Sequence, residues 1–161
     1  MASLYCYPTP EGFDDLLLRS DGGVLTGLWF ESCDVETQGF ASLPPVIQDT
    51  FRWLDIYFSG RQPDFTPTYR MEGLTPFRKA VLEAVCDIPF GNTMTYGEIA
   101  QRLKTNSAQA VGSAVGWNPI CLVVPCHRVI GANGKLVGYG GGINNKIALL
   151  RLEGFELCSG W

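Results

Sequence analysis

Hydrophobic positions in the first sixty residues follow two different periods. The apolar runs Leu16–Arg19 and Val24–Phe30 flank Ser20-Asp21-Gly22-Gly23, whose glycines supply the positive φ that a tight hairpin needs. After Pro44-Pro45, apolar side chains recur at helical spacing until Ser59-Gly60 ends the run. The pattern predicts an antiparallel sheet that is covered by one helix.

The next segment changes character. Residues 61–73 contain Pro63, Pro67 and Gly73 and have little periodicity, which is typical of a linker on the surface. Thr75-Pro76 then provides a helix cap, and a buried apolar stripe runs as far as Ile88-Pro89. We therefore predict an N-terminal domain over residues 1–70 and a second domain, beginning helically, over residues 74–161.

Two short helices are predicted in the second domain. Thr95-Tyr96-Gly97-Glu98 matches a capping box, residues 104–106 form a turn, and Ser107 can cap a helix over residues 108–116. These are the dimensions of a helix-turn-helix. Nearly every residue of the second helix is small, although glycine costs about 1 kcal/mol in a helix. Either tight packing between helices or close approach to a nucleic-acid groove explains this composition.

A thiol stands beside the single histidine of the chain. The apolar run Ile120–Val124 is followed by Pro125, which predicts a buried strand that stops abruptly, and Cys126-His127 come next. A reactive group at such a stop lies at the mouth of a cleft. The pair indicates sulfur chemistry.

Composition and charge limit the class of protein. The chain has 161 residues, 46% hydrophobic and 17% charged, as in a globular protein with a full core. Residues 1–6 lack a basic stretch followed by a long apolar run, and no apolar segment approaches about 18 residues. We expect a cytoplasmic protein without membrane contact.

The net charge of −4 is unevenly distributed. Residues 1–74 hold 4 Lys and Arg against 11 Asp and Glu, whereas residues 75–161 hold 8 against 5. The asymmetry favours an anionic partner for the second half, although small domains also drift in charge by several units.

The six cysteines contain no Cys-x-x-Cys pair, so the sequence predicts neither a disulfide framework nor a four-cysteine zinc site. Cys121, Cys126 and His127 could offer three metal ligands, but neighbours in an extended segment point to opposite sides. We expect no metal and a reducing compartment.

Several ordered elements together resemble one family, the O6-alkylguanine-DNA alkyltransferases. They are Pro125-Cys126-His127-Arg128-Val129, Asn118-Pro119, Thr95-Tyr96, the Gly138 to Gly141 segment, Lys146, Leu149, Leu150 and Glu153. The resemblance is specific over residues 75–155 and loose before them.

The resemblance implies an α+β protein with a ribonuclease-H-like N-terminal domain and a mainly helical domain that contains a winged-helix-like helix-turn-helix. It implies repair of double-stranded DNA by irreversible transfer of an alkyl group from guanine oxygen to a cysteine, once per molecule, by a monomer without a cofactor. Some family members hold zinc in the N-terminal domain, but this chain has no histidine before His127, so we predict no metal there.

The resemblance also implies catalytic roles. Cys126 is the nucleophile, His127 activates it through a water molecule, and Glu153 orients the other imidazole nitrogen. Asn118 orders the active-site turn, and Tyr96 crowds the target phosphate and donates a hydrogen bond to the leaving guanine.

DNA contacts and a base pocket follow from the same resemblance. The small-residue helix would enter the minor groove, and the Cys126 and Val129 carbonyls would line the pocket of the flipped base. The DNA-binding residues are Thr95, Tyr96, Ala108, Gln109, Ala110, Gly112, Ser113 and Arg128, and the pocket residues are Cys126, Val129, Gly138, Tyr139, Gly140 and Gly141. Gln109 stands where the family usually has an arginine.

Two other classes of protein remain open. A non-catalytic sensor of alkylated DNA would use the same scaffold, but related sensors lack the cysteine. A cysteine hydrolase with Cys126, His127 and Asn118 is the third reading, and adjacent nucleophile and base make that geometry poor.

Overall fold

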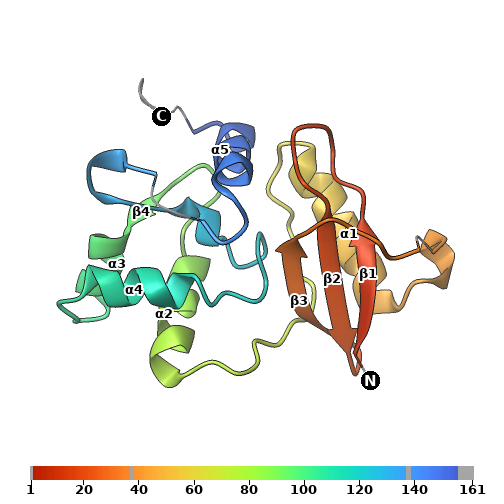
Figure 1. Ribbon diagram of the computed structural model, residues 1–161, viewed down its shortest axis with the longest axis horizontal. Helices are drawn as coiled ribbons and strands as arrows, with labels where there is room; N and C mark the ends of the chain where they lie inside the picture. The colour runs from red at the N-terminus through yellow and green to blue at the C-terminus, as the bar shows by residue number, and fades with distance from the viewer. Residues whose placement is uncertain (1, 37, 137–138, 156–161) are drawn as a thin grey trace.

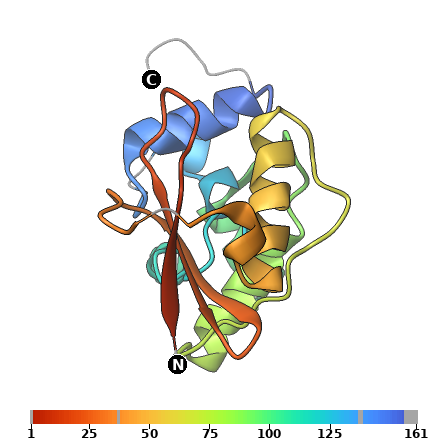
Figure 2. The same ribbon diagram turned by 90° about the vertical axis from the view of Figure 1, so that its right-hand side faces the viewer.

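The computed structural model describes residues 2–36, 38–136 and 139–155. It is an α+β molecule with a three-stranded sheet and helix α1 on one side and helices α2 to α5 on the other (Figure 1). Turning the molecule by 90° shows α1 running beside the strands and α5 lying across one end of them (Figure 2). The α+β prediction is confirmed, and the ribonuclease-H-like and winged-helix descriptions stay predictions.

The N-terminal half is an antiparallel meander under one helix. Its elements are β1 (Ser3–Tyr7), β2 (Leu16–Asp21), β3 (Val24–Phe30), the 3-10 turn η1 (Phe40–Ser42) and α1 (Pro45–Phe58). Gly22 and Gly23 take φ values of 59° and 83°, as the predicted hairpin requires. Sequence reasoning missed β1, which pairs with β2 from Ser3↔Ser20 to Tyr7↔Leu16.

The second half is helical around two very short strands. Its elements are α2 (Pro76–Cys86), β4 (Met94–Thr95), α3 (Tyr96–Arg102), α4 (Ala108–Val115), η2 (Cys126–Arg128), β5 (Val129–Ile130), η3 (Ala132–Gly134) and α5 (Ile143–Leu152). The predicted caps form, because Thr95 Oγ1 accepts from the Glu98 amide at 3.0 Å and Ser107 Oγ accepts from the Ala110 amide at 3.0 Å. Helices α3 and α4 are the predicted helix-turn-helix, whereas α5 was not predicted.

Residues 61–73 are bound to the sheet rather than lying loose. The Leu25 amide donates to the Thr68 carbonyl and the Arg70 amide donates to the Leu25 carbonyl, both at 2.9 Å, so Tyr69 forms a parallel bridge to β3. The division into domains 1–70 and 74–161 stays a prediction. Part of the predicted linker pairs with β3 through backbone hydrogen bonds.

The predicted strand over Ile120–Val124 is wrong. Ile120 makes one isolated bridge to Leu28 of β3, and the chain then folds back so that Cys121 bridges Val124. Leu122 takes a φ of 70° inside this reversal, and the Val124 amide donates to the Ile120 carbonyl at 3.0 Å. The segment is a compact buried turn, which continues into η2, so Cys126 and His127 are not extended either.

The N-terminal cysteines also differ from the expectation. Cys6 and Cys33 form a disulfide with a Cα–Cα distance of 5.8 Å, and the Asp15 carboxylate lies near both sulfurs. The cysteines meet because β1 pairs with β2 and the chain after β3 returns to the same end of the sheet, a contact that cysteine spacing does not reveal. Over the described ranges, no helix is both long and apolar enough to cross a membrane.

Candidate active site

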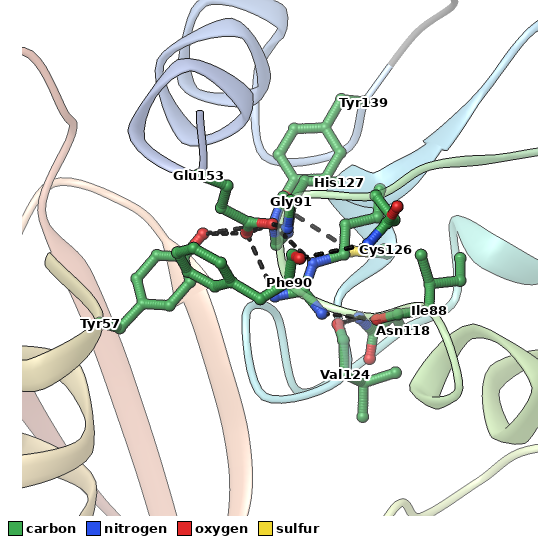
Figure 3. A network of polar contacts seen from close by, with 12 residues as sticks. Tyr57, Ile88, Phe90, Gly91, Asn118, Val124, Cys126, His127, Tyr139 and Glu153 are labelled. Carbon is green, nitrogen blue, oxygen red and sulfur yellow. Dashed lines mark hydrogen bonds and ion pairs between the residues drawn. The ribbon is translucent and has the colours of Figure 1, made fainter. Parts of the chain in front are cut away.

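A buried carboxylate organises the centre of the molecule (Figure 3). Glu153, the C-cap residue of α5, lies between α1 and η2. Its Oε2 accepts from the Tyr57 hydroxyl at 2.5 Å and contacts His127 Nε2 at 2.5 Å, and its Oε1 accepts from the Gly91 amide at 2.9 Å. One side chain therefore joins three segments that are distant in the sequence.

Arg128 completes the cage around this carboxylate. Its Nε donates to Glu153 Oε1 at 2.8 Å and its Nη1 donates to the Ile88 carbonyl at 2.7 Å, and the residue is 5% exposed. The placement corrects the prediction that Arg128 contacts DNA, because a buried guanidinium paired with a carboxylate is not at the surface. Burial alone would raise the pKa of Glu153, but the hydrogen bonds and charges of His127 and Arg128 lower it to about 2.

The histidine is held in one tautomer. A carboxylate only accepts hydrogen bonds, so His127 Nε2, which contacts Glu153, carries a proton. Burial lowers the pKa of His127 from 6.5 against the opposing effect of Glu153, so the ring is neutral at neutral pH. Nδ1 is buried and has no hydrogen-bond partner among the described residues, and it is the nitrogen with a free lone pair.

The Cys126 thiol lies in a polar environment at the edge of a cavity. The pKa of Cys126 is lowered from 9.0 to about 7, chiefly by a hydrogen bond from Cys121, against the effect of burial, and further by Asn118, Tyr139 and the charge of Lys146. Asn118 also orders the turn: its Nδ2 donates to the Val124 carbonyl at 2.9 Å and its Oδ1 accepts from the Ile120 amide at 3.0 Å. A thiol with this pKa is partly ionised at neutral pH.

The cavity has a volume of about 200 Å³ and opens beside the thiol. It is lined by Trp29, Phe30, Tyr96, Gly112, Val115, Gly116, Asn118, Cys121, Cys126, Tyr139, Gly140 and Gly141. Of the predicted pocket residues, Cys126, Tyr139, Gly140 and Gly141 are thus brought together. Val129 does not line this cavity, because its carbonyl accepts from Lys146 Nζ at 2.6 Å, and Gly138 lies outside the described residues.

The remaining predicted DNA-binding residues lie on the surface of α4, beside the cavity or at the start of α3. Ala108, Gln109 and Ser113 are exposed on α4, and Ala110 is half-buried. Gly112 instead faces the cavity, where a Cβ would come 3.6 Å from the Tyr96 ring. The hydroxyl of Thr95 caps α3, and Tyr96 at the start of that helix is half-buried with a pKa raised by burial and by Cys126, so its phenol stays protonated.

Comparison with known proteins places this geometry in a family. Residues 76–155 match the family model described as "6-O-methylguanine DNA methyltransferase, DNA binding domain". A methylated-DNA–protein-cysteine methyltransferase of Mycobacterium leprae is 40% identical over 159 residues, covering 97% of this chain and 96% of the relative. The chain belongs to this methyltransferase family. The predicted resemblance is confirmed, and so is the enzyme class.

Solved structures agree over nearly the whole chain. The crystal structure of the Mycobacterium tuberculosis O6-methylguanine methyltransferase is 40% identical with a TM-score of 0.79, covering 95% of this chain and 93% of that one. The same organism's protein in complex with DNA has a TM-score of 0.79 at 40% identity and covers 93% and 91% of the two chains. The similarity includes the N-terminal half, for which the sequence resemblance was loose.

Several site residues of the methyltransferase were missed from its sequence. Trp29 and Phe30 reach the cavity from β3, and Tyr57 reaches Glu153 from α1. All three occupy apolar positions of a strand or helix pattern, so nothing local separates them from ordinary core residues. Sequence reasoning identified Cys121 only as a possible metal ligand and Lys146 only as an element of the resemblance, and the structure buries both.

Proposed function

We propose that Cys126 is the acceptor of the alkyl group. The thiolate attacks the saturated carbon of O6-alkylguanine, a sulfur–carbon bond forms, and the carbon–oxygen bond breaks with its electron pair leaving on the guanine. The thioether product has no route to hydrolysis, so each molecule acts once, and the reaction needs no cofactor. The single observation that carries this proposal is the lowered pKa of a thiol that lines a cavity.

His127 activates the thiol through a bridging water. The carboxylate of Glu153 holds the Nε2 proton, so Nδ1 is left to accept a proton that the water relays from Cys126. The neutral ring that burial enforces suits a base. Arg128 keeps the carboxylate ionised, and the hydrogen bond from the Tyr57 hydroxyl helps to hold it in place.

The leaving guanine is stabilised by Tyr96. Its phenol lines the cavity with Cys126 and stays protonated, so it can donate a hydrogen bond as charge develops on the purine. Tyr139, Gly140 and Gly141 surround the base and the alkyl group from the other side.

Double-stranded DNA is the substrate, and the exposed face of α4 is the surface we assign to it. The small, exposed Ala108 and Ser113 permit close approach to a minor groove. The target base must rotate out of the stack to reach the cavity. The excess of basic residues after residue 75 supports the same surface. One-shot chemistry requires only a monomer.

We place the protein in the cytoplasm, with access to the chromosome. In a reducing compartment, the Cys6–Cys33 pair should exist mainly as thiols. Thiol labelling in intact cells followed by mass analysis would report both cysteines as reduced, and a protected pair would argue against this location.

Intact mass spectrometry tests the acceptor. The protein is mixed with a duplex oligonucleotide that contains O6-methylguanine, and we expect the mass of one methyl group on the Cys126 peptide. Cys126→Ala should gain nothing, and Cys86→Ala, which removes an exposed free thiol, should behave like the parent. Repair by Cys126→Ala would overturn the proposal.

The same measurement separates the alternative functions. A damage sensor would bind the methylated duplex and leave both partners unchanged in mass. A cysteine hydrolase would turn over an ester or amide repeatedly and release the group. Only a transferase leaves one permanent methyl group and a restored guanine.

A further inference from the structure

A second buried thiol lines the cavity beside the acceptor. Cys121 is 8% exposed and Cys126 is 5% exposed, and both face the same cavity of about 200 Å³. The established transfer to a single cysteine gives Cys121 no role.

The fold holds Cys121 in this place from two sides. Its amide donates to the Leu28 carbonyl of β3 at 2.8 Å, and its carbonyl accepts from the Val123 amide at 2.8 Å. The bridge between Cys121 and Val124 closes the turn, and the Cys126 amide donates to the Val124 carbonyl at 2.8 Å. The two cysteines therefore belong to one rigid reversal that brings their side chains to the same cavity.

The two thiols share one cavity but not the same surroundings. Cys126 Sγ lies 3.9 Å from the Tyr139 hydroxyl. Asn118 and the charge of Lys146 lower the pKa of Cys126. The pKa of Cys121 is raised well above 9.0 by the neighbouring Cys126 thiol and by burial. Cys126 is consequently the thiol that ionises, and Cys121 keeps its proton.

We propose that Cys121 is a positioning residue for the transfer reaction, whose S–H donates a hydrogen bond to the Cys126 thiolate and holds that sulfur toward the cavity. The inference rests on the proposed role of Cys126 as acceptor. Thiolates are strong acceptors, and a donor in a largely buried site stabilises the anion more than it would in bulk water, because the local dielectric is lower. Cys121 acts through Cys126 and does not itself receive the alkyl group.

The test is the pH profile of the reaction at Cys126. Single-turnover transfer from a methylated duplex is followed between about pH 5.5 and pH 9.5 for the parent, Cys121→Ala and Cys121→Ser. The parent should show a midpoint near 7. Cys121→Ala lacks the donor, so its midpoint should rise by about one unit and its rate at neutral pH should fall roughly fivefold, with rates converging at high pH.

Cys121→Ser retains a donor and should restore the parent midpoint. Cys86→Ala, which removes a free thiol outside this cavity, should leave the profile unchanged. A substitution that merely damaged packing would lower the rate equally at every pH. An unchanged midpoint in Cys121→Ala, or equal losses for Ala and Ser across the whole range, would overturn the inference.

A second readout does not depend on DNA. Iodoacetamide alkylates thiolates, so the rate at the Cys126 peptide, measured by mass spectrometry, should show the same displaced midpoint in Cys121→Ala. If the parent fails to accept a methyl group from DNA while this displacement is present, the proposed function fails, and only the stabilisation of the Cys126 thiolate by Cys121 stands. If the parent accepts methyl and the displacement is absent, the positioning role fails alone.

Discussion

At the scale of single residues, Glu153 has the largest predicted effect on stability. Its carboxylate offsets the buried Arg128 guanidinium, so Glu153→Gln leaves that charge uncompensated and should cost about 3–5 kcal/mol at neutral pH. Urea denaturation measures this loss. Glu72→Gln removes a carboxylate whose Arg70 partner is 52% exposed, and we expect a change of no more than about 0.5 kcal/mol.

The same residue predicts how stability responds to acid. The pKa of Glu153 is about 2 in the folded protein and 4.5 ordinarily, so its contribution is complete above about pH 4.5 and disappears as the pH falls toward 2. His127, whose pKa is lowered by burial, adds to the loss below its ordinary value of 6.5. The urea midpoint of the parent should therefore fall steeply on acidification, and Glu153→Gln should lack the lower part of that decline. Parallel curves for parent and variant would contradict this assignment.

At the scale of elements, the loop Gly140-Gly141-Gly142 before α5 should limit the size of the alkyl group that the cavity accepts. A Cβ on Gly141 would lie 2.6 Å from a Tyr139 ring carbon and 3.0 Å from a Phe30 ring carbon, so Gly141→Ala must displace the cavity wall. We expect O6-benzylguanine to label the parent at Cys126, and Gly141→Ala to lose benzyl transfer at least about tenfold more than methyl transfer. Gly140→Ala, whose Cβ would meet nothing within 4 Å, is the control. Failure of benzylguanine to label the parent would refute the prediction.

Helix α4 carries the second prediction at this scale. Gln109 is exposed at its start and supplies neither a charge nor a guanidinium plane to fill the gap left by a flipped base. Gln109→Arg should raise the rate on duplex substrate on the order of tenfold, which corresponds to about 1.4 kcal/mol of the flipping cost. The rate on free benzylguanine should not change. The control is Gln38→Arg, which adds the same charge at an exposed position of the N-terminal half and should change neither rate. Equal rates on duplex DNA for the parent and Gln109→Arg would contradict the prediction.

The elements that sequence predicted are those with local signals. Gly22-Gly23, Thr95 and Ser107 mark a hairpin and two helix starts through bonds within four residues, and all three form. Ile120–Val124 has the composition of a strand but makes only two isolated bridges. Ile120 bridges Leu28 of β3, and the chain then folds back so that Cys121 bridges Val124, which prevents a continuous strand pairing. Arg128 was assigned to DNA on the resemblance, and its actual partner, Glu153, lies 25 residues away in the sequence. Whether an arginine or lysine side chain is buried depends on tertiary contacts, which a local sequence pattern does not reveal.

At the scale of the whole molecule, the N-terminal half is part of the active site. Trp29 and Phe30 of β3 form one wall of the cavity, and β3 binds the active-site turn through the Leu28 and Cys121 backbones. The sequence placed every predicted catalytic residue after residue 95, in the second predicted domain. The acidic half instead supplies a cavity wall and the hydroxyl that fixes Glu153.

A substitution of Tyr57 tests whether the N-terminal half contributes to the catalytic site. Tyr57→Phe removes a buried hydroxyl that donates to Glu153 at 2.5 Å and contacts His127 at 3.2 Å, so we expect a loss of about 1.5–3 kcal/mol in stability and a change in the pH profile of alkyl transfer. Tyr7→Phe removes a comparable bond, from a hydroxyl to Asp55 of the same helix at 2.6 Å, but lies outside the site. Both variants should lose stability in urea, and only Tyr57→Phe should alter the pH profile. If the two variants behave alike in transfer, α1 supports the fold without tuning the catalytic histidine, and the N-terminal half reaches the chemistry only through its cavity wall.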